Sequence, residues 1–120
     1  MSILDTTTEP IVINRLYRLA VKIHLIVNEF IKQEKYGLGR RIESALSNCI
    51  GSACLAAQEQ KGFKAQPLCV AIAQADLVNI LLRMAHELGL ITTVQYQSLG
   101  TELVEITSML GGWLRFSRQQ

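Results

Sequence analysis

Hydrophobic residues recur at intervals of three and four positions along most of this chain, in four long segments separated by short breaks. The first segment, residues 9 to about 35, has the following apolar residues: Val12, Leu16, Leu19, Ile23, Ile26, Val27 and Phe30. This spacing brings side chains to one face of an α-helix. Because β-branched residues form no alternating run, the pattern predicts an all-α protein.

The same periodicity predicts three more helices. They are expected at residues 38–61, 65–88 and 93–116. Thr92 or Thr93 would cap the start of the last helix, and Gly37 would end the first in a left-handed conformation. Short turns between such helices favour an antiparallel up-down-up-down four-helix bundle. This bundle would span residues 9–118, after a disordered N-terminal tail at residues 1–8.

The third predicted helix is apolar over roughly 200° of its circumference, about twice what a surface helix in a monomeric bundle requires. It is either wedged between several helices or in contact with a second subunit along one flank. We predict a homo-oligomer, with four residues of that flank at the interface: Ala71, Ala75, Val78 and Leu82.

Positive charge is concentrated in the first half of the chain, although the formal net charge is only +2. The basic residues of interest lie on the polar side of the first helix and at the start of the second: Arg15, Arg18, Lys22, Lys32, Arg40 and Arg41. An ordinary solvated face explains such a stripe as well as a binding surface does. As a binding surface, it would contact the phosphates of RNA or DNA without reading sequence.

No pattern of catalytic or metal-binding residues accompanies this charge. Cys49, Cys54 and Cys69 are odd in number and form no Cys-x-x-Cys pair, so neither a disulfide framework nor a zinc site is expected. His24 and His86 have no ligand set around them, and we interpret both as packed, hydrogen-bonded side chains. The sequence therefore predicts no catalytic residue, no metal and no cofactor, and a protein that is not an enzyme.

The chain is expected to be cytoplasmic and to have no contact with a membrane. No apolar window reaches the roughly 18–20 uncharged residues of a spanning helix. Residues 1–5 lack the basic region and apolar core of a signal peptide. The unpaired cysteines favour a reducing compartment.

Three motifs resemble one family of helical bundles. They are Lys-Tyr-Gly-Leu-Gly-Arg-Arg-Ile at 35–42, Leu-Gly-Leu-Ile-Thr at 88–92 followed by Tyr96, and Met-Leu-Gly-Gly-Trp-Leu at 109–114. Their order and spacing resemble the superfamily of ribosomal-RNA intervening-sequence proteins and Avd, the accessory variability determinant of diversity-generating retroelements. Residues 47–57 lack the Pro-Ala-Asn-Ile-Ala-Glu-Gly stretch usual in intervening-sequence proteins, which favours Avd.

The resemblance implies a non-catalytic accessory protein. Avd proteins form a pentameric barrel, bind nucleic acid through basic surfaces, and associate with a reverse transcriptase that makes error-prone cDNA. The charge pattern adds Glu102 and Glu105, on one face of the fourth helix, as candidates for the polymerase contact. Simple solvation of both is the alternative. A scaffold of the intervening-sequence type, without a reverse transcriptase partner, is the alternative function.

Overall fold

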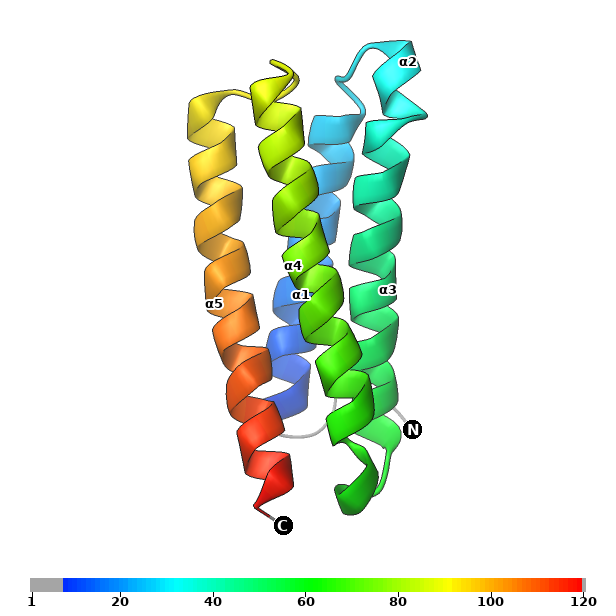
Figure 1. Cartoon of the computed structure of the whole chain (residues 1–120), viewed down its shortest axis with the longest axis vertical. Helices are drawn as coiled ribbons and strands as arrows, with labels where there is room; N and C mark the ends of the chain where they lie inside the picture. The colour runs from blue at the N-terminus through cyan, green and yellow to red at the C-terminus, as the bar shows by residue number, and fades with distance from the viewer. Residues whose placement is uncertain (1–7, 120) are drawn as a thin grey trace.

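Four long antiparallel helices form a bundle in the computed structural model, which describes residues 8–119 and side chains from residue 11 onward (Figure 1). The elements are α1 (Thr8–Val27), α2 (Lys32–Lys35), α3 (Leu38–Gln58), the 3₁₀ turn η2 (Lys61–Phe63), α4 (Ala65–Glu87) and α5 (Thr93–Arg118). Both α1 and α4 pack against α3 and α5, so α1 and α4 lie at diagonal corners. The predicted fold class is confirmed; the predicted tail, apart from Thr8, lies outside the described residues.

The first helix is shorter than predicted, because α1 ends at Val27 and the chain turns before the four-residue helix α2. The Phe30 amide donates to the Val27 carbonyl at 2.9 Å, and the Phe30 side chain is buried. Beyond Phe30, the positions that would continue the apolar stripe are Gln33, Glu34 and Gly37. A longer helix would therefore bury nothing further against the core.

Gly37 and Gly39, at the start of α3, have different roles, and the role of Gly37 is not the predicted one. Gly37 is the N-cap of α3 with φ −98°, so it does not form the expected left-handed cap. The positive φ, +75°, belongs to Gly89 in the turn between α4 and α5. Gly39 is buried where the end of α1 meets the start of α3, and a Cβ there would lie 2.5 Å from Cγ1 of Val27. It is therefore a site of close helix approach.

The start of α5 follows the prediction closely. Thr92 is its N-cap, and the Gln95 amide donates to the Thr92 hydroxyl at 3.0 Å. In return the Thr92 amide donates to the Gln95 side-chain oxygen at 2.9 Å. This reciprocal capping box satisfies two backbone groups that the first turn would leave unpaired.

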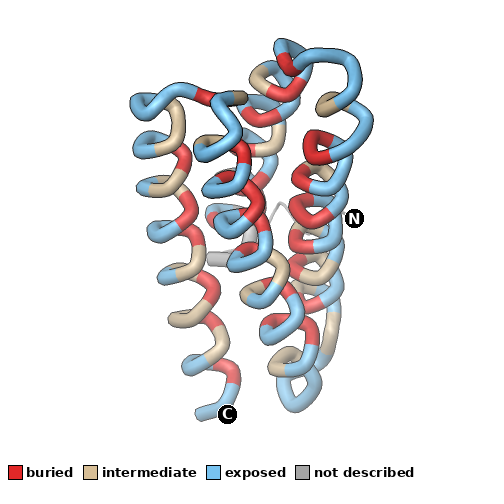
Figure 2. The backbone as a smooth tube through the Cα atoms, turned by 45° about the horizontal axis from the view of Figure 1, so that its top comes forward, coloured by how far each residue is buried: buried red, intermediate tan, exposed pale blue. Residues whose placement is uncertain are grey.

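The core corrects the predicted subunit interface. Ala71, Ala75 and Val78 expose 0% of their surface and Leu82 exposes 1%, all within a single chain. Figure 2 shows that the buried positions lie on the inner sides of the helices. These four residues cannot meet another subunit while the bundle is folded. Of the two explanations for the wide apolar arc, burial between helices of the same chain is correct for this flank, because α4 is wedged between α3 and α5.

Among the described residues, α4 is apolar enough by length and composition alone to cross a membrane, with a mean hydropathy of 1.6 over 18 residues. Its buried side chains belong to the core shared with α3 and α5. The core helix of a bundle satisfies the same criterion.

Candidate nucleic-acid interface

The predicted basic stripe and the predicted acidic pair meet each other across the contact between α1 and α5. Arg15 Nη2 lies 2.6 Å from Oε1 of Glu105, and Lys22 Nζ lies 2.6 Å from Oε2 of Glu102. The prediction of two separate surfaces, one for nucleic acid and one for a polymerase, is therefore wrong for these four residues. Because α1 and α5 are antiparallel neighbours, their residues pair in reverse order along the chain.

The outer side of α1 is apolar where the charge pattern predicted a basic stripe. Arg18 is exposed there, but three large apolar side chains share this side: Tyr17, Val21 and Leu25, which expose 61%, 45% and 62% of their surface. They recur every four residues, so they form one stripe. A groove of about 310 Å³ lies between this stripe and α3.

Four cations gather at the end of the bundle that carries α2. Lys32 and Lys35 belong to α2, and Arg40 and Arg41 open α3. The predicted residues Lys32, Arg40 and Arg41 are all exposed, and no ion pair joins any of the four to an acidic side chain among the described residues. We call this set the corner cluster. Of the basic positions predicted from sequence, Lys32, Arg40 and Arg41 lie together in this cluster, whereas Arg18, which also forms no ion pair with a described residue, lies apart on α1.

Sequence reasoning missed two members of this region, Lys35 and Tyr36. The guanidinium of Arg40 lies over the Tyr36 ring, 5.7 Å from its centroid. The exposed phenol of Tyr36 is thus held beside the Arg40 cation, which follows it by four residues. The spacing of Tyr36 and Arg40, four residues apart in the Lys-Tyr-Gly-Leu-Gly-Arg motif, was the available signal.

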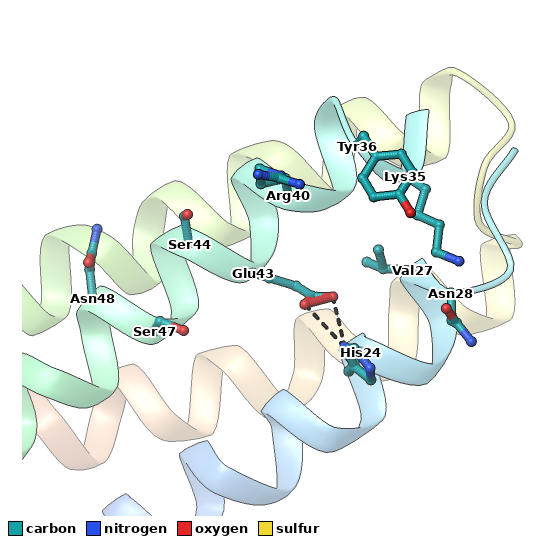
Figure 3. A pocket seen from close by; sticks show the side chains of 10 residues that line it. All are labelled: His24, Val27, Asn28, Lys35, Tyr36, Arg40, Glu43, Ser44, Ser47 and Asn48. Atoms are coloured by element: carbon teal, nitrogen blue, oxygen red, sulfur yellow. Dashed lines mark hydrogen bonds and ion pairs between the residues drawn. The ribbon is translucent and has the colours of Figure 1, made fainter. Parts of the chain in front are cut away.

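A groove of about 420 Å³ opens beside the corner cluster (Figure 3). It is lined by His24, Val27, Asn28, Lys35, Tyr36, Arg40, Glu43, Ser44, Ser47 and Asn48. His24 Nδ1 lies 3.1 and 3.2 Å from the two carboxylate oxygens of Glu43. The expected hydrogen bond of His24 is therefore present, but its side chain is 66% exposed instead of packed.

His86 bonds to Thr93 and stacks on Tyr96.

A second apolar stripe lies on the outer side of α4. It consists of Val70, Ala73, Leu77, Ile80 and Met84, which alternate at intervals of three and four residues and are all exposed. His86 marks the side of α4 that faces α5, through its contacts with Thr93 and Tyr96. At 100° per residue the centre of the stripe lies roughly 160° from His86, so it faces away from α5.

The neighbouring outer side of α3 carries no charge beyond its first turn. Its exposed residues there, beyond those that line the groove, are Gly51 and Leu55. They lie away from Glu43, which reaches toward His24 on α1. The packed pair of α3 and α4 therefore presents a broad uncharged face, which we call the α3–α4 face.

Burial disfavours the ionised form of two of the three cysteine thiols, Cys49 and Cys54. Burial raises the pKa of the Cys49 thiol to about 12, and burial also raises the pKa of Cys54. A thiol held protonated is a poor nucleophile and a poor metal ligand. The described residues contain no group of three or more His, Cys, Asp or Glu side chains placed to hold a metal ion.

Comparison with known proteins adds a family and a fold. A family model described as bAvd-like matches residues 11–117. A solved structure of a protein of unknown function from the S23 ribosomal protein family of Bacteroides thetaiotaomicron superposes with a TM-score of 0.82. That protein is 19% identical over 91% of this chain and 99% of its own, and at this identity the likeness concerns the fold alone. The comparison with curated proteins finds no match.

Proposed function

The chain belongs to the bAvd-like family, and from this premise we propose that it is the non-catalytic accessory protein of a diversity-generating retroelement. In this role it binds nucleic acid and a reverse transcriptase in the cytoplasm and supports mutagenic cDNA synthesis. It contributes no chemistry of its own. Its task is to hold the polymerase and the nucleic acid together.

The observation that carries the nucleic-acid role is the corner cluster. Its four cations share one end of the bundle and none is neutralised by a described acidic side chain. Lysine and arginine at such a surface contact phosphates and displace condensed counterions. Arg15 and Lys22 add less, because each is already paired with a carboxylate.

We infer that the protein assembles through the two outer apolar surfaces, the α3–α4 face and the stripe of Tyr17, Val21 and Leu25 on α1. These surfaces differ from each other, and the stripe on α4 lies on the helix diagonal to α1. Joining one surface to the other is a heterologous contact, which generates a ring when the rotation closes. The family resemblance implies five subunits. Such a ring would repeat the corner cluster around its axis and raise the local positive potential.

The nucleic-acid role is tested by titrating a labelled oligonucleotide at several salt concentrations. Binding should weaken steeply with salt, and the double variant Arg40→Glu/Arg41→Glu should reduce both the affinity and the salt slope. Because both side chains are exposed, the variant should keep its helical circular-dichroism spectrum. Affinity that does not change with salt would contradict the role.

The polymerase role is tested by co-expression with the reverse transcriptase encoded by the same retroelement. The two proteins should purify together, and cDNA synthesis should require the accessory protein. A polymerase that never co-purifies and works equally well alone would favour a helical scaffold without such a partner.

A further inference from the structure

Tyr36 is an exposed aromatic ring at the rim of a polar groove. It exposes 58% of its surface, and it is the one phenol among the residues that line the groove of about 420 Å³. Figure 3 shows it above the space between the end of α1 and the start of α3, with Lys35 and Arg40 on either side. An aromatic face flanked by cations is the combination that proteins use to hold unpaired bases.

The interior of this groove suits the edge of a nucleobase. Asn28, just after the end of α1, supplies an amide group, and Ser47 on α3 supplies a hydroxyl, from opposite walls of the groove. Such groups both donate and accept hydrogen bonds, as base edges do. The acidic wall residue Glu43 is engaged by His24. The volume falls within the roughly 300–1,000 Å³ of small-ligand sites.

We propose that this groove takes one unpaired nucleotide of a single-stranded nucleic acid, with the base stacked on Tyr36 and its phosphate at Lys35 and Arg40. The proposal rests on the nucleic-acid role proposed above and narrows its substrate class. In a duplex the bases are already stacked and paired, so a duplex can offer the corner cluster only phosphates. The groove therefore makes the protein prefer single strands to duplexes.

The test compares a fluorescein-labelled single strand with the same strand annealed to its complement, using the full-length protein and fluorescence anisotropy. Tyr36→Ala should weaken single-strand binding about 5- to 150-fold, the range for loss of one base–aromatic stack. Duplex binding should stay within about twofold, because its phosphate contacts are unchanged. Tyr36→Phe keeps the ring and should bind like the natural protein. RNA and DNA versions of the single strand distinguish the two sources of the nucleotide.

The matched control is Phe63→Ala. Phe63 is also an exposed aromatic, at 65%, but it lies in η2 at the opposite end of the bundle and lines none of the grooves described above. Removing the Phe63 ring should change the affinity for neither the single strand nor the duplex. Equal losses for single strand and duplex in Tyr36→Ala, or no loss in either, would overturn the stacking site while Arg40→Glu/Arg41→Glu still reports on nucleic-acid binding. If the natural protein binds neither the single strand nor the duplex, the stacking site and the nucleic-acid role are both wrong.

Discussion

Gly39 packs directly against Val27, at the point where the end of α1 meets the start of α3. A Cβ at position 39 would lie 2.5 Å from Val27 Cγ1 and 3.3 Å from the carbonyl oxygen of Glu34. The absence of a side chain therefore sets the distance between the two helices. It also positions Lys35, Tyr36 and Arg40, which lie on either side of this contact.

We expect Gly39→Ala to destabilise the bundle by about 1–3 kcal/mol, the usual cost of forcing a methyl group into a packed core. Gly51→Ala is the matched control, because a Cβ at position 51 meets nothing within 4 Å. In that exposed helical position alanine should stabilise by about 0.5–1 kcal/mol. Urea unfolding followed by circular dichroism measures both. Equal effects at the two positions would refute the close-approach interpretation.

The two outer apolar surfaces predict a specific mixing result. Val21→Glu and Leu77→Glu should each dissociate the oligomer, because each places a charge in one half of the same contact. Both side chains are exposed in the single chain, at 45% and 38%, so both variants should remain folded. An equimolar mixture retains one intact pair of surfaces and should form a dimer and nothing larger by light scattering.

The contrasting variant is Ala75→Glu. Ala75 is fully buried within one chain, so a glutamate there should unfold the bundle, because an unpaired charge in the core is costly. If Ala75→Glu instead gave a folded monomer, the subunit interface would lie on the flank of α4 that contains Ala75, as predicted from sequence. A Val21→Glu and Leu77→Glu mixture that stays monomeric would show that the two surfaces do not contact each other.

Removing the carboxylates of the α1–α5 ion pairs should strengthen nucleic-acid binding. Glu102→Gln/Glu105→Gln leaves Lys22 and Arg15 free to contact phosphates, so the salt slope should steepen by up to about 2. The fold should survive, since exposed ion pairs contribute about 0–1 kcal/mol each. Asp76→Asn/Glu87→Gln changes net charge equally without freeing a paired cation, and it should give a smaller gain. Equal gains would mean that only net charge matters.

Cys49 makes stability depend on alkaline pH. Burial raises its pKa in the folded protein from 9.0 to about 12, so between these values only the unfolded chain loses the proton. Its contribution to stability is complete below pH 9 and is lost as pH rises toward about 12, at about 1.4 kcal/mol per pH unit. Cys49→Ala removes this titration, so the difference in pH dependence between the two proteins isolates it. Parallel curves would show that Cys49 does not titrate this way.

Helix positions were predictable because local signals mark them. The Thr92 cap and the short breaks in the apolar pattern placed α3, α4 and α5 within a few residues of their observed bounds. The end of α1 was missed because Phe30 continues the apolar period and is buried outside the helix. Periodicity records that a residue is apolar but not which neighbour covers it.

Which flank of a helix is covered depends on contacts distant in sequence. The apolar arc of α4 was recognised, but Ala75 and Leu77 could be assigned to core and surface only once α3 and α5 were in place. Arg15 and Glu105 were both selected as charged surface residues, and their pairing required knowing that α1 and α5 are neighbours. The groove beside Tyr36 likewise combines residues from three helices.

The contact between α1 and α5 joins the first and last helices of the chain, and this sets an order of folding. Glu105 follows Arg15 by 90 residues, and closing a flexible loop of that length costs about 4 kcal/mol. By contrast, α3 and α4 are separated by residues 59–64 and can pair while the chain is still being synthesised. The core side of α1 stays partly uncovered until α5 has left the ribosome, so a chain truncated before α5 exposes Leu16 and Ile23 to any chaperone that binds apolar helices.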